Sequence, residues 1–330
     1  MKKILLLWYM QDDNFGDVLI SQTIKDYLEK YDCVVEDHEV GDYWENIVKH
    51  ANECDFLLFA GGGIIERGVP NVLINWDKVA EELQIPYGVV GLGIGEFNHD
   101  KYSEQFKIWV DNSKFFFVRD SHTQEKMNGY SHSKKVVFSA DCVFANKSLK
   151  ADSHCISEKI AINVRDLPYE DLTGVLDWAT VNTIIKKPNI EKLIMDSSDE
   201  MNNSCIFDAE ENSQYLKMDK NAKTEYIIQN IAECRAIVAM RFHVVLVAAR
   251  MGIPSVPIEY CPKVKYLSEQ LGLQNLSVTI ENLSDIPDKV KELMDHMEYY
   301  QKLIRENVII LEKKADEMFR YVTDIIFREN

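Results

Sequence analysis

The sequence predicts an α/β protein with two doubly wound domains that face a cleft, followed by a long helical segment. Short, almost continuously apolar runs alternate with helical stretches in each half of the chain, which is typical of parallel sheets covered by helices on both faces. The 330 residues, 46% of them hydrophobic, can fill two cores of ordinary size. A polar, weakly patterned stretch near residue 150 separates the two series of runs.

The expected strands are rich in β-branched and aromatic residues, and the first helix is expected over residues 18–31, where apolar residues recur at helical spacing. The strands are expected at 3–10, 33–40, 55–63, 86–95, 114–120 and 135–141 in the first half, and at 159–165, 190–197, 235–240, 254–260 and 276–280 in the second. The pattern predicts a Rossmann-like domain over residues 1–150, another over residues 151–285, and a helical segment over residues 286–330 that packs across the domains.

Composition argues against several classes of protein. Lys and Arg number 37 against 54 Asp and Glu, a net charge of -17, whereas a nucleic-acid-binding surface is basic. No apolar run approaches the ~18 residues of a transmembrane helix, and the short run at the N-terminus predicts a strand rather than a signal peptide. The 7 cysteines are odd in number and never in CxxC spacing. We therefore expect a cytoplasmic protein with no disulfide framework, structural zinc site, other metal or cofactor.

Ligands of open α/β sheets bind beyond the carboxyl ends of the strands, so the turns there are candidate sites. After the first strand, Asn14 and Gly16 shape a tight turn, and Asp17 is either a helix N-cap or a carboxylate that faces the cleft. Arg119 follows the fifth strand beside Asp120, either as a salt-bridged structural pair or as a residue of the cleft.

Glycines follow the third and fourth strands. Gly61, Gly62 and Gly63 come after the third strand, and Gly93 lies in the run "GLGIG". Such glycines serve equally well for a tight turn or for the close approach of a ligand to the backbone. No GxGxxG pattern and no P-loop lysine accompanies them, so a dinucleotide site is not supported.

The segment "AIVAMRFHVVLVAARMG" predicts a strand followed by a helix, with Arg241 and His243 at the junction. The N-terminus of a helix favours an anion, and a guanidinium adds a planar fork of donors suited to phosphate or carboxylate. His243 can donate a hydrogen bond or a proton near neutral pH. An arginine opposes the helix dipole at this position, so the pair predicts an anion site.

The motifs resemble, in order, those of polysaccharide pyruvyl transferases. "NFGD", "GGGII", "GLGIG", "VRD" and "SADCVF" precede "RFHVVLVAARMGIPSVPIEYCPKV", and together they lie between residues 14 and 264. The resemblance implies two domains of the GT-B kind. It also implies transfer of the pyruvyl group of phosphoenolpyruvate onto two hydroxyls of a sugar in a cell-surface or extracellular polysaccharide precursor, with formation of a cyclic ketal and release of phosphate.

The resemblance implies that Arg241, the backbone of Phe242 and His243 contact the phosphate of this donor, and that Arg165 also binds the donor. Lys263 completes the set of cations that a substrate with a phosphate and a carboxylate needs.

His243 is the candidate general acid. For the general base, Asp17 is the first candidate and Glu259 the second, although Glu259 could equally pair with Lys263.

Two positions depart from the family pattern, with Cys142 where proline is usual and Cys261 where aspartate is common. These departures leave open a non-catalytic member that binds a sugar or anion. A GT-B glycosyltransferase that uses a nucleotide sugar also stays open, because the Arg241 and His243 pair would suit a diphosphate too. The expected acceptor is a sugar or a lipid-linked saccharide, and a lipid-linked acceptor would require only peripheral membrane contact at the inner face. The long helical segment permits a homodimer.

Overall fold

The computed structural model describes residues 1–10, 14–65, 68–95, 99–131, 133–150, 158–164, 190–192 and 217–328. The chain forms two compact units. The first unit comprises Met1–Asp12, Asp17–Asn146 and Leu311–Asn330, and the second comprises Asp13–Gly16 and Lys147–Ile310. The domain bounds expected from the sequence remain a prediction.

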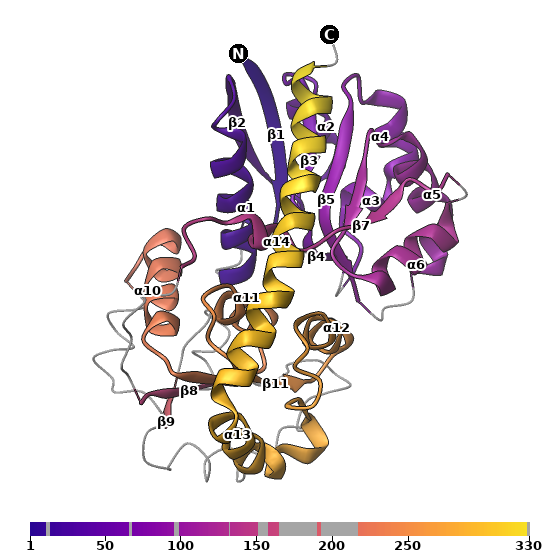
Figure 1. Ribbon diagram of the computed structural model, residues 1–330. Coiled ribbons are helices and arrows are strands. Elements are labelled where there is room, and N and C mark those ends of the chain that lie inside the picture. Colours follow the sequence, from indigo (N-terminus) through magenta and orange to yellow (C-terminus); the bar gives the residue numbers. More distant parts are fainter. Residues whose placement is uncertain are drawn as a thin grey trace. The chain divides into compact units, whose positions relative to one another are not determined.

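The first unit is built on a parallel sheet (Figure 1). Its strands are β1 (Lys2–Trp8), β2 (Cys33–Glu39), β3 (Phe56–Phe59), β4 (Gly62–Ile65), β5 (Tyr87–Ile94), β6 (Phe116–Val118) and β7 (Val136–Phe138). They follow the order β2-β1-β3-β5-β6-β7, and β4 pairs with β5. The order reverses between β1 and β3, so this unit has a topological switch point where the loops after these two strands begin.

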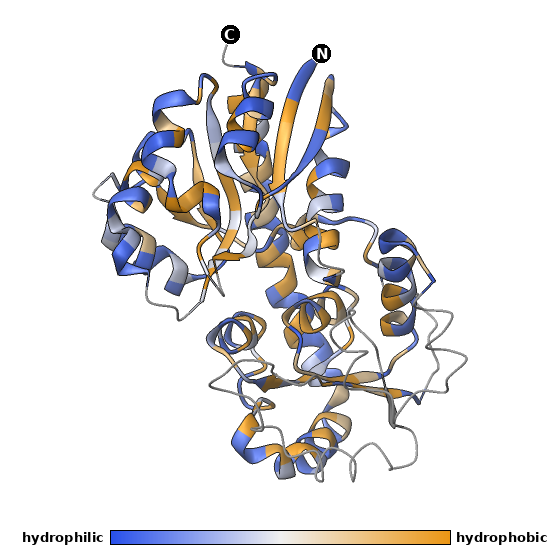
Figure 2. Cartoon of the chain, turned by 180° about the vertical axis from the view of Figure 1, so that it is seen from behind, coloured by the Kyte–Doolittle hydropathy of each residue, from blue (hydrophilic) through white to orange (hydrophobic). Residues whose placement is uncertain are grey.

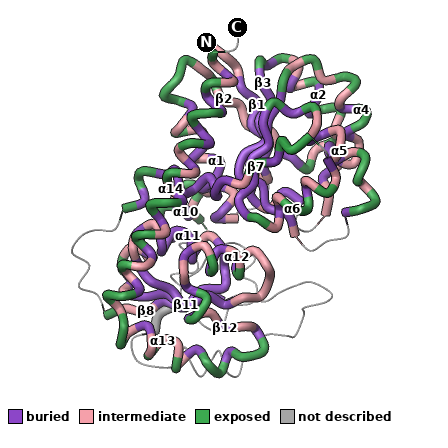
Figure 3. Tube along the Cα trace, turned by 45° about the vertical axis from the view of Figure 1, so that its right-hand side comes forward, coloured by how far each residue is buried: buried purple, intermediate pink, exposed green. Residues whose placement is uncertain are grey.

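Helices cover both faces of this sheet. They are α1 (Phe15–Leu28), α2 (Trp44–Ala51), α3 (Asn71–Ile74), α4 (Trp76–Glu82), α5 (Ser103–Asn112), α6 (Ser121–Tyr130) and the last part of α14 (Met297–Arg328), with 3-10 turns η1 (Asp100–Tyr102) and η2 (Cys142–Ala145). Phe116 of β6 joins a core with Trp76 and Trp109 of α4 and α5. Its neighbour Phe117 points to the other face, where its ring contacts Tyr321 of α14 at 5.7 Å. Figure 3 shows the resulting buried strands in purple.

The second unit contains another parallel sheet, in the order β12-β11-β10-β8-β9. Its elements are β8 (Ile160–Asn163), β9 (Ile190–Lys192), α10 (Lys220–Ala232), β10 (Ala236–Ala239), α11 (Phe242–Arg250), β11 (Ser255–Glu259), α12 (Pro262–Leu271), β12 (Val278–Thr279), η3 (Ile280–Asp285), α13 (Ile286–Asp295) and the first part of α14. This order reverses between β8 and β10, which gives the second unit its own switch point. The apolar strands appear in orange in Figure 2, and the outer helix surfaces carry most of the blue.

The predicted alternation of parallel strands and helices is confirmed, with one difference in the first unit. The run at residues 55–63 was expected as one strand, whereas β3 ends at Phe59 and β4 begins at Gly62. Gly61 and Gly62 have φ of 71° and 68°, in the left-handed region that glycine adopts without steric cost. This turn lets the chain leave β3 and pair again with β5.

Replacing Gly61 by alanine is expected to destabilise the protein by about 2–5 kcal/mol. A Cβ at this position would lie 1.9 Å from the carbonyl oxygen of Val90, and the positive φ adds strain. A left-handed residue with a side chain costs about 1–2 kcal/mol and overpacking adds about 1–3 kcal/mol.

The matched control is Gly129→Ala, because Gly129 lies in α6 and a Cβ there would have no atom within 4 Å. Alanine is the better helix former, so this variant should be neutral or more stable by up to about 1 kcal/mol. Urea unfolding of both variants measures the difference, and equal stabilities would contradict the steric role of Gly61.

Candidate functional site

Asn163, the last residue of β8, connects the two strand ends at the switch point of the second unit. Its side chain is fully buried, and its Oδ1 accepts a hydrogen bond from the backbone N–H of Arg241 at 3.0 Å. Its carbonyl oxygen also accepts from the N–H of Met240 at 2.9 Å. Asn163 therefore fixes the backbone of Arg241 where β10 turns into α11.

Arg241 is the N-cap residue of α11 and is only 9% exposed. Its carbonyl oxygen accepts the N–H groups of Val244 and Val245 at 3.1 and 3.2 Å, so the first turn of the helix is formed directly on this residue. The guanidinium is always charged, and the partial positive charge of a helix N-terminus lies beside it. Both favour an anion at this point, and the anion site itself stays a prediction.

Phe242 and His243 form the first turn of α11. Phe242 is 7% exposed, and its ring meets the His243 ring edge-on at 5.0 Å between centroids. Gly16 also contacts His243 within the second unit, since a Cβ on Gly16 would lie 1.9 Å from Nδ1 of His243. Asn14 holds this turn, because its Oδ1 accepts the N–H of Gly16 at 2.9 Å. Residues predicted from two separate motifs, Asn14 and Gly16 from one and His243 from the other, are thus brought together.

Glu259 and Lys263 lie on the neighbouring strand and helix. Glu259 is the last residue of β11, and Lys263 is the second residue of α12; both side chains are half-buried. β10 and β11 pair in parallel, so the helices that follow them, α11 and α12, begin at the same edge of the sheet. Arg165, the remaining predicted donor contact, lies outside the described residues.

The switch point of the first unit joins Asp17 and Gly62. A Cβ on Gly62 would lie 3.1 Å from Oδ1 of Asp17, so the glycine makes room for this carboxylate. The helix α1 begins at Phe15, which gives the N-cap position to Asn14 and places Asp17 inside the first turn. Gly63 does not have a positive φ.

Arg119 has the geometry of a structural ion pair. It is 3% exposed, and its Nη1 donates to Oδ2 of Asp141 at 3.4 Å while its Nε lies 3.8 Å from Oδ2 of Asp120. Gly93 leaves space for it, because a Cβ there would lie 2.4 Å from Nε of Arg119. These contacts are those of the salt-bridged pair, one of the two alternatives open in the sequence, and the role of Arg119 in the cleft stays a prediction.

The two carboxylates of this ion pair also begin helices. Asp120 accepts the N–H of Thr123 at 2.7 Å at the start of α6, and Asp141 accepts the N–H of Val143 at 3.0 Å at the start of η2. Cys142, beside Asp141, is 1% exposed and lies against Gly91, where a Cβ would come within 2.7 Å of its Sγ. Burial raises the pKa of this thiol, as expected of a packing residue rather than a nucleophile.

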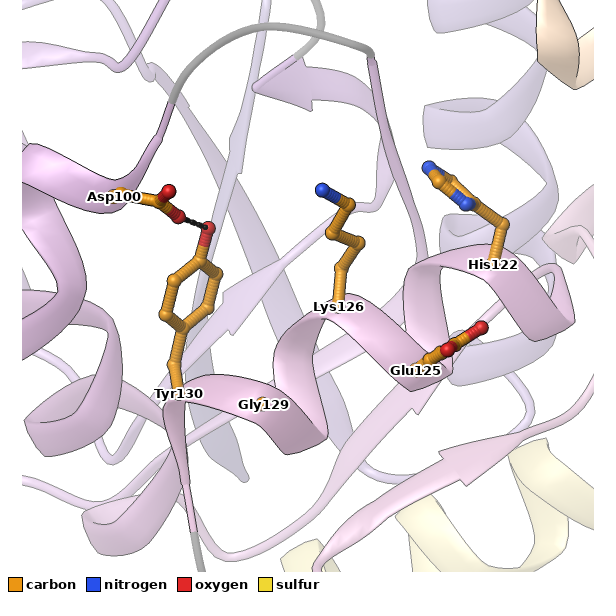
Figure 4. A pocket seen from close by; sticks show the side chains of 6 residues that line it. All are labelled: Asp100, His122, Glu125, Lys126, Gly129 and Tyr130. Carbon is orange, nitrogen blue, oxygen red and sulfur yellow. Dashed lines mark hydrogen bonds between the residues drawn. The ribbon is translucent and has the colours of Figure 1, made fainter.

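A cavity of about 490 Å³ opens beside α6 in the first unit (Figure 4). It is lined by Asp100, His122, Glu125, Lys126, Gly129 and Tyr130. Figure 4 shows His122 and Lys126 on the same side of α6, and the hydroxyl of Tyr130 donates to Asp100 at 3.0 Å. Burial and this bond raise the pKa of Tyr130 to about 12, so the hydroxyl keeps its proton.

Comparison with known proteins identifies the family. The profile of the polysaccharide pyruvyl transferases matches residues 14–262, which include both switch points and the Arg241 turn. The chain belongs to the polysaccharide pyruvyl transferase family.

One relative in sequence and two solved structures are similar to this chain. The amylovoran biosynthesis protein AmsJ of Erwinia amylovora is 23% identical over 303 residues, which cover 82% of this chain and 72% of AmsJ. MnaA of S. aureus, in a co-structure with UDP, has a TM-score of 0.63 at 12% identity and covers 99% of this chain and 97% of its own. UDP-GlcNAc 2-epimerase of Neisseria meningitidis has a TM-score of 0.58 at 10% identity, with coverages of 98% and 100%. These structures confirm the GT-B-like fold.

Two features of this polysaccharide pyruvyl transferase family member were missed in the sequence. The first is Asn163, whose only signal in the sequence is that it is a single polar residue in an apolar strand. Its partner Arg241 lies 78 positions away, so the contact itself left no local pattern. His122, Lys126 and Tyr130 recur every four residues, a spacing that places them on one face of a helix.

The structure also bears on membrane association of this family member. Across the residues that it describes, none of the helices combines the length and the hydropathy needed to cross a bilayer.

Proposed function

We propose that the protein transfers the pyruvyl group of phosphoenolpyruvate onto two hydroxyls of a sugar in a polysaccharide precursor. The observation that supports this most is the buried Arg241 at the N-terminus of α11, held by Asn163 at the switch point of its unit. Phosphoenolpyruvate carries a phosphate and a carboxylate on one small frame, and this turn concentrates positive charge in a protein with a net charge of -17.

The reaction needs proton transfer at both ends of the donor. C3 of phosphoenolpyruvate gains a proton, and C2 becomes electrophilic. One sugar hydroxyl attacks C2, the C2–O bond to phosphate breaks, and the second hydroxyl closes the ketal. The two hydroxyls lose two protons, of which one balances the proton gained by C3 and the other leaves with phosphate. An acid, a base and stabilisation of the leaving phosphate are therefore required.

Within this proposal, Arg241 and the N–H groups at the start of α11 bind the phosphate, and His243 donates to it as it leaves. Lys263 and Arg165 complete the donor site. Asp17 is the first candidate for the base because Gly62 leaves its carboxylate room at the other switch point, and Glu259 is the second. The first unit would bind the sugar, and its cavity beside α6 offers hydroxyl, amine and carboxylate groups to a saccharide.

A thermal-shift series on the intact protein tests the donor. Phosphoenolpyruvate is expected to raise the melting temperature, because a ligand that binds the folded state at 100 times its Kd adds about 2.7 kcal/mol of stability. Inorganic phosphate should act more weakly because it lacks the carboxylate. Stabilisation by UDP or CMP sugars, with phosphoenolpyruvate silent, would instead support a nucleotide-sugar glycosyltransferase.

A further inference from the structure

A chain of hydrogen-bonded side chains links the edge strand β2 to helix α2 in the first unit. His38 Nε2 lies 3.0 Å from Oδ2 of Asp42, and His38 Nδ1 lies 2.9 Å from Nδ1 of His50. His50 Nε2 in turn lies 2.8 Å from Oε2 of Glu36. The chain runs from one carboxylate to another through two imidazoles, and all four residues are at least partly buried.

A count of protons shows what this chain requires. Ionised carboxylates only accept hydrogen bonds, so the three contacts between Asp42, His38, His50 and Glu36 need three protons. Two neutral imidazoles carry one N–H each and supply two. If His38 donates to Asp42 and His50 donates to His38, then Nε2 of His50 turns a lone pair toward the Glu36 carboxylate. A positive species, either a proton or a metal ion, must lie at that contact.

A thiol beside this contact favours the metal ion. Cys54 follows α2 and is 8% exposed, and its thiol donates to the carbonyl oxygen of His50 at 3.6 Å. One ligand atom each from Glu36, His50 and Cys54 lies within 4.8 Å of the other two. A proton between His50 and Glu36 would gain little from a thiol, whereas thiolate, imidazole and carboxylate are all ligands of Zn²⁺.

We propose that Glu36, His50 and Cys54 bind a Zn²⁺ ion. Ligand atoms about 2.0–2.3 Å from zinc are about 3.3–3.8 Å apart in a tetrahedron. Nε2 of His50 and Oε2 of Glu36, which are 2.8 Å apart, must therefore separate slightly to bind the ion. The three ligand atoms lie within 4.8 Å of one another, so the widest separation must shorten by up to about 1 Å. With zinc bound, two protons suffice for the two remaining contacts of the chain.

His38 and Asp42 would then act as positioning residues. A histidine that binds a metal usually donates its other N–H to an acceptor, which fixes the ring and its tautomer. Here His50 would donate to His38, and His38 to Asp42. The fourth position of the ion would take water, since the side chains of His50 and Glu36 are 28% and 33% exposed.

The site would lie away from the proposed reaction. His50 lies in the last turn of α2, so the ion would lie on the amino-terminal side of the sheet, away from Asp17 and Gly62 at the carboxyl ends. It would tie β2, an edge strand, to α2 and to the turn that precedes β3. Edge strands expose unpaired backbone groups, and fastening one reduces its tendency to pair with other chains.

Lys3 opposes the ion and gives a distinctive test. Its Nζ lies 3.1 Å from Oε2 of Glu36 and would be repelled by a divalent cation. The Lys3 side chain is 34% exposed, so it can move into solvent. Replacing Lys3 by methionine should therefore strengthen zinc binding, by about tenfold, whereas damage to the fold would weaken it.

The experiment is a calorimetric titration of the full-length, metal-stripped protein with ZnCl₂. One equivalent of Zn²⁺ is expected to bind, while Mg²⁺ and Ca²⁺, which prefer oxygen ligands, should not. His50→Ala and Cys54→Ser should weaken binding by at least about 100-fold, and His38→Ala by about 10–100-fold. Cys33→Ser is the matched control, because the Cys33 thiol donates to the Leu28 carbonyl outside the group and its loss should leave affinity unchanged.

Co²⁺ provides a second measurement. The wild type should show a thiolate-to-cobalt absorption band that Cys54→Ser lacks. The proposal would be overturned if Zn²⁺ failed to bind the wild type, or if His50→Ala or Cys54→Ser bound it with wild-type affinity. Weaker zinc binding in Lys3→Met than in the wild type, or a wild-type cobalt spectrum without the thiolate band, would also overturn it.

Discussion

Replacing Arg241 by methionine is expected to raise the Kd for phosphoenolpyruvate by about 30- to 5,000-fold, since removing one partner of a buried, hydrogen-bonded charge pair costs about 2–5 kcal/mol. Methionine keeps much of the volume of the side chain but removes its charge and its donors. Arg241→Lys keeps the charge and loses the planar fork, so we expect a smaller loss, of about tenfold. Isothermal titration with phosphoenolpyruvate measures both.

Arg250→Met is the matched control for Arg241. Arg250 ends the same nine-residue helix and is half-buried. Nine helical residues span about 13 Å, so its loss should leave the Kd unchanged. Asn163→Ala should weaken binding less than Arg241→Met, because it frees the Arg241 backbone without removing the guanidinium. If folded Arg241→Met binds phosphoenolpyruvate with the same Kd as the wild type, the α11 turn is excluded as the donor site.

Arg119→Met should destabilise the protein by about 3–5 kcal/mol, the typical cost of removing one partner of a buried ion pair. The side chains of Asp120 and Asp141 are 7% and 1% exposed, so their charges would be left in the interior with Arg119 gone. Urea unfolding at neutral pH measures the loss. Adding Asp141→Asn to Arg119→Met should recover part of it, because one uncompensated charge is then removed.

A surface pair serves as the control for this measurement. Arg328 Nη1 lies 3.0 Å from Oδ1 of Asp324, closer than the 3.4 and 3.8 Å that separate Arg119 from Asp141 and Asp120, but the two side chains are 79% and 50% exposed. Arg328→Met should change stability by no more than about 1 kcal/mol. Equal losses in the two methionine variants would show that burial does not determine the contribution of Arg119.

The fold was largely predictable because parallel strands buried on both faces leave apolar runs in the sequence. The separate strand β4 was not, since its boundary depends on the positive φ of Gly61 and Gly62 and on space beside Val90. Glycine in a sequence permits such a turn without requiring it.

The candidate site was predictable where one short segment carries the chemistry, as with Arg241 and His243. It was not predictable where the partner is distant in sequence. Asn163 contacts Arg241, which is 78 positions later in the sequence. Arg119 donates to Asp141, which is 22 positions later. The Glu36, His50 and Cys54 group likewise lacks the CxxC spacing by which zinc sites are usually found in a sequence.

The division of α14 has a consequence for biosynthesis. The first unit takes its last segment from Leu311 onward, where Phe319 stacks on Tyr27 at 4.6 Å and Tyr321 contacts Phe117. While the ribosome is still translating the second unit, Tyr27 and Phe117 lack these contacts with α14. The first unit can thus complete its packing only after the segment from Leu311 onward has emerged, and a nascent chain that stalls earlier presents an apolar surface to chaperones.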